Sequence, residues 1–239
     1  MYSRTELLVG TEGLERLKGA HVLVVGLGGV GGYAAEQLCR AGIGELTLID
    51  GDVIQPSNRN RQIIALTSTE NKPKADTLAK RLQDINPDCK LNIISEYIRD
   101  ERMVEILSSA SYDYVVDAID TLSPKVFLIY HSIQMGLKIV SSMGSGGKTN
   151  PEKIQIADVS KSHTCPLAYM VRKRLHRLGI RKGFKVVFSP EEIPSHAMRE
   201  DISTNKRTTI GTISYMPPLF GCFCASVVIR DILGERAVE

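Results

Sequence analysis

Short apolar runs alternate with amphipathic segments along most of this chain. The runs His21–Val25 and Glu45–Ile49 have the length of strands that are buried on both faces. Between such runs, apolar residues recur at helical spacing, as in Lys74–Ile85, which stops at Asn86-Pro87. A regular alternation of strand and helix predicts an α/β fold with a mostly parallel sheet and helices on both faces.

The alternation continues to residue 145. After a helical lead-in over residues 1–20, each predicted strand is followed by a glycine-rich or polar turn. Ligands of such a doubly wound, Rossmann-like sheet bind at the carboxyl ends of its strands. We expect strands at His21–Val25, Glu45–Ile49, 91–94, 114–118 and 138–141, and helices at 33–39, Lys74–Ile85, 100–107 and 124–135.

The pattern changes beyond residue 150. Segments 153–159 and 185–189 resemble strands with a helix over 166–178 between them, which predicts a mixed or antiparallel C-terminal extension of the sheet. Residues 191–208 are polar and aperiodic and predict a mobile loop, whereas 211–214 predict a short strand. No shift in composition divides the chain, so we expect residues 1–239 to form a single domain.

The closing segment, Met216–Leu233, is the most apolar of the chain. It contains Pro217 and Pro218 at its start and carries Arg230 and Asp231 near its end. A membrane-spanning helix needs about 20 predominantly apolar residues. We therefore expect a buried or interface helix and no stable insertion into a membrane.

Composition and cysteine content indicate the class of protein and its cellular compartment. A chain of 239 residues, 43% hydrophobic and 24% charged, can bury a substantial core, and its net charge of +3 is too small to indicate a partner. It has five cysteines, an odd number, and no Cys-x-x-Cys pair. The first residues do not form the charged start and apolar core of a transport signal. These features predict a cytoplasmic protein with free thiols.

A glycine-rich turn follows the first predicted strand. Gly26, Gly28 and Gly31 fit the pattern Gly-x-Gly-x-x-Gly, and Gly29 adds a fourth glycine. Between a strand and a helix, such a turn lets the backbone approach phosphate oxygens, which the N–H groups at the helix N-terminus bind. Asp50, at the end of the second strand, is placed to accept ribose hydroxyls. These residues fit NAD and ATP equally, and the alternative is a tight turn without a ligand.

A polar cluster after the second strand distinguishes the two nucleotides. The run Asn58-Arg59-Asn60-Arg61-Gln62 follows within a dozen residues of Asp50, and Lys74 opens the next helix. Cations beside a phosphate site suit a polyphosphate whose charge rises as a bond breaks. Any one of these residues could instead be a solvated surface residue. Together they favour ATP over a nicotinamide cofactor.

Two aspartates follow the fourth predicted strand. Asp120 lies on the sheet edge that carries the other clusters, where its carboxylate could hold Mg²⁺. This ion takes one or two protein carboxylates and leaves its other positions to phosphate and water. Asp117 is nearer the strand and is predicted to be a structural partner. The alternative for both is capping of the next helix.

The assembled pattern resembles the ubiquitin-activating-enzyme-like superfamily, which includes the ThiF family, over residues 1–145. The resemblance implies adenylation of a carboxylate, with a ribose contact from Asp50 and a metal contact from Asp120. It implies phosphate contacts from Asn58, Arg61 and Lys74. The matching positions are the glycines of 26–31, Asp50-Gly-Asp52, Ser57-Asn58, Arg61-Gln62, Lys74 and Asp117-Ala-Ile-Asp120.

The N-terminal residues add to this resemblance. Tyr2-Ser3-Arg4 is similar to a segment whose arginine reaches across a homodimer to the ATP of the partner. Arg4 is therefore a candidate catalytic residue acting in trans, although a terminal arginine is more often solvated. The resemblance implies a homodimer that uses ATP and Mg²⁺. A monovalent cation and a cysteine-desulfurase or sulfur-acceptor system are further candidate partners.

The whole chain resembles one branch of the superfamily, the tRNA threonylcarbamoyladenosine dehydratases. Members that activate sulfur carriers usually hold structural zinc in two Cys-x-x-Cys pairs, and Cys222-Phe-Cys224 has the wrong spacing for this, so we expect no structural zinc. The stretches Met143-Gly-Ser-Gly-Gly147 and Cys165-Pro-Leu-Ala168 match the dehydratases instead. The resemblance implies that residues 1–150 bind ATP and that residues 151–239 bind tRNA and form dimer contacts. The implied reaction is ATP-dependent dehydration and cyclisation of N6-threonylcarbamoyladenosine in tRNA, through an acyl-adenylate.

A basic segment independently indicates a nucleic-acid partner. No Asp or Glu occurs from residue 159 to 190, whereas Lys and Arg recur throughout. Such a stripe would bind the phosphate backbone of tRNA without reading its sequence, although a solvated helix face has the same pattern. The candidate tRNA contacts are Arg172, Lys173, Arg174, Arg177, Arg181, Lys182 and Lys185.

Cys165 allows two interpretations. It precedes Pro166 at a predicted helix start, where a thiolate that carries a covalent intermediate would be stabilised. The other interpretation is a plain thiol in a mobile loop. We favour the second, because dehydration of an activated carboxylate needs no covalent enzyme intermediate.

Three other functions remain compatible with the sequence. An adenylating enzyme for a ubiquitin-like sulfur carrier or a small peptide would require that partner and ignore tRNA. A Rossmann oxidoreductase would bind NADH, and the cluster from Asn58 to Gln62 speaks against it. A non-catalytic RNA-binding protein would bind tRNA without consuming ATP.

Overall fold

The computed structural model describes residues 1–200 and 208–234, and within them seven strands form one sheet in the order β3-β2-β1-β4-β5-β7-β6. Neighbouring strands are parallel except β6 and β7, which are antiparallel. The predicted Rossmann-like, mostly parallel sheet with a mixed C-terminal extension is therefore confirmed. The strands are β1 (His21–Val25), β2 (Glu45–Ile49), β3 (Lys90–Ile94), β4 (Tyr114–Asp117), β5 (Ile139–Ser142), β6 (Gln155–Asp158) and β7 (Lys185–Phe188).

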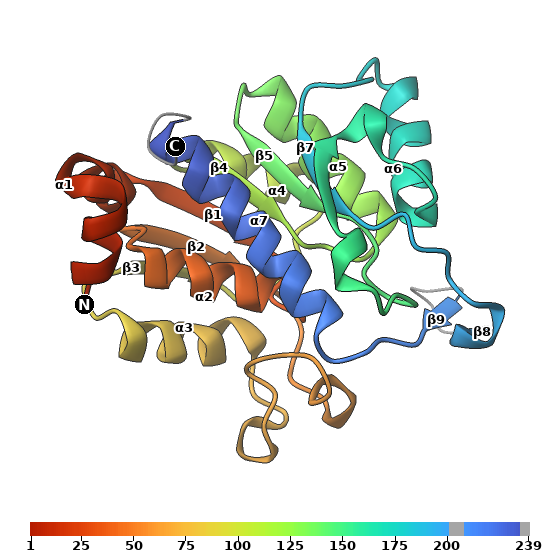
Figure 1. Cartoon of the computed structure of the whole chain (residues 1–239), viewed down its shortest axis with the longest axis horizontal. Coiled ribbons are helices and arrows are strands. Elements are labelled where there is room, and N and C mark those ends of the chain that lie inside the picture. The colour runs from red at the N-terminus through yellow and green to blue at the C-terminus, as the bar shows by residue number, and fades with distance from the viewer. Residues whose placement is uncertain (201–207, 235–239) are drawn as a thin grey trace.

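Helices cover both faces of this sheet (Figure 1). Because side chains alternate along a strand, Val22 and Val24 of β1 face one hydrophobic core and Leu23 and Val25 face the other. The first core is completed by α1 (Ser3–Gly19), α2 (Gly31–Ala41), α3 (Lys74–Ile85) and α7 (Met216–Leu233), and the second by α4 (Asp100–Ser108), α5 (Leu122–Gln134) and α6 (Pro166–Arg177).

The apolar helix α7 is a core element. Among the described residues it is the one helix long and apolar enough to cross a membrane, with a mean hydropathy of 1.5, and half of it is buried inside the protein. Phe220, Cys224 and Val228 follow one another at helical spacing and are completely buried. Apolar composition here reflects packing against α2 and the sheet (Figure 1).

The region before α7 differs from the prediction. Part of the expected loop 191–208 forms β8 (Met198–Glu200), which pairs antiparallel with β9 (Thr208–Ile210). The short strand therefore precedes residues 211–214, which are not a strand. Three-residue strands in a polar segment are too short to show an alternating pattern. The rest of the expected loop includes 201–207, which lie outside the described residues.

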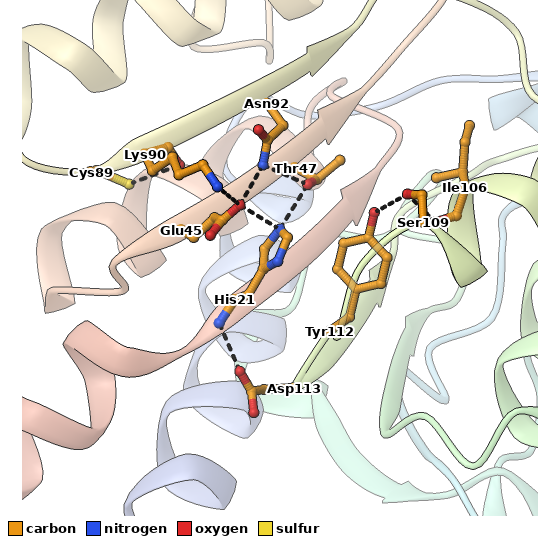
Figure 2. A network of polar contacts seen from close by, with 10 residues as sticks. All are labelled: His21, Glu45, Thr47, Cys89, Lys90, Asn92, Ile106, Ser109, Tyr112 and Asp113. Carbon is orange, nitrogen blue, oxygen red and sulfur yellow. Dashed lines mark hydrogen bonds and ion pairs between the residues drawn. The ribbon is translucent and has the colours of Figure 1, made fainter.

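A polar network closes the amino-terminal edge of the sheet (Figure 2). The His21 ring is 2.8 Å from the Thr47 hydroxyl and 3.6 Å from the Glu45 carboxylate. Lys90 lies 2.8 Å from the same carboxylate, and the His21 backbone N–H donates to Asp113. The network joins β1, β2 and β3 at the edge opposite the glycine turn.

We predict that His21 makes the fold sensitive to mild acid. Burial lowers the pKa of His21 below its usual 6.5; Glu45 and Asp113 oppose this shift and Lys90 adds to it. The unfolded chain then binds a proton more readily than the folded chain, so stability falls as the pH drops below about 6.5. The limiting slope is about 1.4 kcal/mol per pH unit.

Urea unfolding of the wild type and His21→Gln between pH 5 and 8 measures this contribution. The wild type should lose more free energy of unfolding than the variant on acidification. Parallel pH profiles for the two proteins would contradict the prediction.

Candidate active site

The glycine turn lies at the carboxyl edge of the sheet, packed against the end of β4. Gly26 has a φ of +86°, and a Cβ there would lie 2.8 Å from the Ala118 carbonyl oxygen. A Cβ on Gly31 would lie 1.7 Å from the Gly26 oxygen. Both positions therefore require glycine. This close packing brings the N-terminus of α2 beside the turn that carries Asp117 and Asp120.

Asp50 is fixed by the glycine turn itself. Its Oδ2 accepts a 2.7 Å hydrogen bond from the Leu27 N–H, and its Oδ1 accepts a 2.8 Å bond from the Asp52 N–H. Burial raises the pKa of Asp50, while Lys74 and these two N–H groups oppose the shift. A carboxylate has about four acceptor positions, so two remain for ribose hydroxyls.

Lys74 forms an ion pair with Asp52. Its side chain is buried, and its Nζ lies 2.7 Å from Asp52 Oδ2. The Tyr97 hydroxyl donates to the other oxygen of Asp52, and this bond raises the pKa of Tyr97 to about 12. The structure thus places Lys74 near Asp50 and gives it a carboxylate partner in Asp52. Tyr97 comes from the loop after β3 and was not identified from the sequence.

Arg61 packs against the glycine turn. A Cβ built on Gly29 would lie 3.2 Å from Arg61 Cγ, and the guanidinium donates to the Ser57 carbonyl at 3.1 Å. Asn58 has a structural contact, because its Oδ1 accepts the Gln55 N–H at 3.0 Å. The loop and 3-10 turn after β2 thus bring Arg61 to the glycine turn, whereas the Asn58 side chain and the Ser57 carbonyl make contacts within the loop itself.

Gln62 supplies an orphaned polar atom in this cluster. The residue is 7% exposed, and its Oε1 has no hydrogen-bond partner among the described residues. Its Nε2 lies 3.5 Å from the position of a Cβ on Gly28, so the amide borders the glycine turn. A buried acceptor without a donor is costly unless a ligand or water supplies one. The hydroxyls of a nucleotide and the waters around its phosphates are suitable donors, so the residues present fit ATP.

A fully buried ion pair underlies the end of β4. Lys125 Nζ lies 2.7 Å from Asp117 Oδ2, and neither side chain is exposed. Ser141 of β5 donates to the same oxygen at 2.5 Å, and Lys125 also donates to the Ile119 carbonyl at 2.8 Å. Asp117 thus has a structural role as the partner of Lys125 and Ser141. Lys125 lies next to the candidate site and was not identified from the sequence.

Asp120 lies exposed just beyond β4, in the turn that touches Gly26 and Gly31. Within residues 1–200 and 208–234, no group of three or more His, Cys, Asp or Glu side chains gathers to hold a metal. Mg²⁺ can be held by one protein carboxylate together with phosphate and water oxygens. Asp120 therefore fits such an ion in position and chemistry.

Arg4 lies at the opposite edge of the sheet from this cluster. It is exposed in the first turn of α1, next to Tyr2, whose ring lies 3.1 Å from the position of a Cβ on Gly42. Gly42 precedes β2, so Tyr2 and Arg4 lie near the amino ends of the strands. A five-residue strand is about 16 Å long, which separates Arg4 from the glycine turn of its own chain.

The predicted tRNA contacts do not all lie together. Arg172, Lys173, Arg174 and Arg177 belong to α6, and Arg174 donates to the Ser123 hydroxyl of α5 at 2.7 Å. Arg181 and Lys182 are exposed in the turn that follows. Lys185 differs, because it starts β7 and its Nζ pairs with Asp231 of α7 at 2.6 Å. Since α7 covers the other face of the sheet, the structure separates Lys185 from the α6 cations.

Cys165 is not in a mobile loop. Its side chain is 2% exposed, and the residue forms the N-terminal boundary of α6. The sulfur lies 3.7 Å from the position of a Cβ on Gly144 in the loop after β5. The expectation that Cys165 is a thiol in a mobile loop is therefore wrong, because its side chain packs in the second hydrophobic core.

Comparison with known proteins agrees with this geometry. The sequence model of the ThiF family matches residues 2–239. A tRNA threonylcarbamoyladenosine dehydratase from Bacillus subtilis (strain 168) is 41% identical over 248 aligned residues, which cover 100% of this chain and 96% of the relative.

Two crystal structures of the E. coli dehydratase TcdA superpose on almost the whole chain. The complex with ATP has a TM-score of 0.89 and 33% identity, and covers 99% of this chain and 95% of TcdA. The complex with AMP has a TM-score of 0.88 and 33% identity, and covers 98% and 94% of the two chains. The protein therefore belongs to the ThiF family, in the branch that contains the tRNA threonylcarbamoyladenosine dehydratases.

Proposed function

We propose that this protein catalyses the ATP-dependent dehydration of N6-threonylcarbamoyladenosine in tRNA. The observation that carries the proposal is its full-length similarity to a dehydratase that was crystallised with ATP and with AMP. The glycine turn, Asp50, Arg61 and Lys74 supply a matching nucleotide site at one edge of the sheet. The proposed division of labour assigns ATP to residues 1–150 and tRNA and dimer contacts to residues 151–239.

The proposed chemistry has two steps. A carboxylate oxygen of the threonylcarbamoyl group attacks the α-phosphorus of ATP, the bond to pyrophosphate breaks, and an acyl-adenylate forms. A nucleophilic atom of the same side chain then attacks the acyl carbon and gives up its proton to solvent, and AMP leaves with the electron pair of the C–O bond. The ring closes with net loss of one water from the nucleoside. The AMP complex of TcdA supports cleavage at the α-phosphate.

The residues have distinct proposed roles. Asp50 and Asp52 orient the ribose of the nucleotide. The backbone N–H groups of Gly28, Gly29 and the α2 N-terminus donate hydrogen bonds to phosphate oxygens. Ser57 and Asn58 shape the loop that places Arg61. Arg61 and Lys74 stabilise the charge that develops on the phosphates. Asp120 would hold Mg²⁺, which supplies further stabilisation of that charge when bound.

Mass spectrometry of the modified nucleoside tests the function directly. The protein is incubated with ATP, Mg²⁺ and tRNA that carries threonylcarbamoyladenosine, and the nucleoside should lose the mass of one water. Omitting ATP should abolish the loss. An unchanged nucleoside mass with competent tRNA, or ATP–pyrophosphate exchange that needs a sulfur-carrier protein and ignores tRNA, would contradict the proposal.

The position of Arg4 supports a homodimer with shared sites. Arg4 lies too far from its own glycine turn to contact the same ATP, so we assign it to the site of a second copy. Arg4→Ala and Lys74→Ala homodimers should each be nearly inactive. After mixing and subunit exchange, each heterodimer has one intact site, so activity should recover to on the order of a quarter of the wild type.

Two outcomes separate this arrangement from its alternatives. Mixing without recovery, although mass analysis shows that heterodimers form, would place Arg4 in cis or outside the site. A monomer in solution with full activity would exclude a shared site altogether.

The remaining partners are part of the same proposal. The exposed cations of α6 and the following turn bind the tRNA backbone, and the reaction takes place in the cytoplasm. A monovalent cation and a cysteine-desulfurase or sulfur-acceptor system are further candidate partners, which the nucleoside assay can test by addition.

A further inference from the structure

An aromatic row lies on the outer face of α5. Phe127 is 43% exposed, and its ring stacks on His131 with a centroid separation of 5.8 Å and an interplanar angle of 25°. Tyr130 contacts the same imidazole edge-on at 5.1 Å. Ser123 and Phe127 are one helical turn apart and share this outer face. A large exposed ring on a helix that already packs one face on the core is available to a partner.

The basic helix α6 borders this row. Arg174 reaches across to the Ser123 hydroxyl at 2.7 Å and so joins the outer faces of the two helices. Met170 and Leu178 lie one turn before and one turn after Arg174 and are 37% and 47% exposed. The surface made by Ser123, Phe127, His131, Met170 and Arg174, here called the α5–α6 surface, therefore combines a stacking ring, apolar contacts and a cation.

Charge decides which partner suits the α5–α6 surface. No acidic residue occurs between residues 159 and 190, so α6 presents only cations and neutral groups. A nucleic-acid duplex would contact only the cations, through its phosphates, and would make no use of Phe127. Single-stranded RNA would use both the cations and the ring, because its unpaired bases stack on aromatic side chains while basic side chains bind its backbone.

We infer that the α5–α6 surface binds an RNA loop, with an unpaired base stacked on Phe127 and an adjacent phosphate on Arg174. The inference rests on the proposed function and extends it, since it locates where single-stranded residues near the modified nucleotide are held. Ser123 follows Asp120 by three residues, so the surface adjoins the nucleotide site. Phe127 is then a positioning residue for the substrate.

The test compares an RNA hairpin with a fully paired duplex of the same length, using equilibrium binding to the full-length protein. Phe127→Ala should weaken hairpin binding about 5- to 150-fold, which is the range for one lost stacking interaction, and leave duplex binding unchanged. ATP binding should stay at the wild-type level and shows that the variant is folded. Leu66→Ala, which removes an exposed apolar side chain from the loop after Gln62, is the matched control and should bind both RNAs as the wild type does.

Phe127→Trp gives a second readout. The chain contains no tryptophan, so the substituted ring would be its sole indole fluorophore. It should retain hairpin binding, and its emission should be quenched by the hairpin but not by the duplex.

The possible results separate the two proposals. Hairpin binding that Phe127→Ala leaves unchanged, or indole emission that the hairpin leaves unchanged, would overturn the inference while the dehydratase function stands. Binding of a protein partner that Phe127→Ala abolishes, with hairpin binding intact, would also overturn it. A wild type that binds neither tRNA nor hairpin would refute the proposed function itself.

Discussion

Replacing Lys125 by methionine is expected to lower the free energy of unfolding by about 3–5 kcal/mol, which is the usual cost of leaving one member of a buried ion pair alone. The Asp117 and Lys125 side chains are both 0% exposed and lie 2.7 Å apart. Methionine is similar in length to lysine and fills the space, so the loss comes from the unpaired carboxylate and not from a cavity. Urea unfolding measured by circular dichroism gives the change.

Two controls isolate the charge. The double variant Asp117→Asn, Lys125→Met contains no buried charge and should recover a substantial part of the loss. Arg102→Met removes a partner of Glu96 at 2.7 Å, but both side chains are about half exposed and solvent screens the pair, so the cost should be far smaller than that of Lys125→Met. A Lys125→Met loss as small as that of Arg102→Met would show that Asp117 does not depend on its partner.

Lys125→Met should also affect ATP binding, because its partner Asp117 links the ends of β4 and β5. Asp117 accepts hydrogen bonds from Ser141 of β5 and from the Ile119 N–H, so it fixes the turn that carries Asp120. Loss of Lys125 would loosen this turn. ATP binding by Lys125→Met should therefore weaken even under conditions in which the variant remains folded.

The sequence predicted the parallel sheet because its signals are local. Residues 22–25 are an unbroken apolar run, and all five residues of β1 (His21–Val25) are buried. The glycine turn was also predicted from a local pattern, Gly-x-Gly-x-x-Gly, because the fold requires glycine at Gly26, where a Cβ would clash with Ala118. The rule that ligand groups follow strands was then enough to place Asp50 and Asp120 at one edge of the sheet.

The rest depended on contacts between distant segments. Lys125 sits in a helix whose sequence gives no sign that its ammonium is buried, and its network needs Ser141 from another strand. Lys185 looked like part of one basic stripe, but the alternation of side chains in β7 turns it toward Asp231. In the same way, the link from Arg174 to Ser123 joins segments that are 51 residues apart.

Removing the ammonium of Lys74 is expected to slow ATP-dependent dehydration about 100- to 1,000-fold, the usual cost of losing one charge-stabilising group. Lys74 is buried beside the glycine turn and lies 2.7 Å from Asp52, which leaves two of its three donors for phosphate oxygens. Without it, the site would lose the cation that lies beside Asp50 and Asp52, and its net charge would repel the phosphates more strongly. Lys74→Met preserves the apolar part of the side chain, and nucleoside mass analysis over time gives the rate.

Lys72→Ala is the matched control, because Lys72 is an exposed lysine two residues earlier and should leave the rate within about 2-fold of the wild type. A second variant, Asp52→Asn combined with Lys74→Met, is compared with Asp52→Asn alone to distinguish two roles of the ammonium. If Lys74 contacts the phosphates, the double variant is much slower than Asp52→Asn, because nothing replaces the charge stabilisation that the ammonium supplied. If Lys74 serves only to neutralise Asp52, the two variants have the same rate, and direct phosphate stabilisation by Lys74 is excluded.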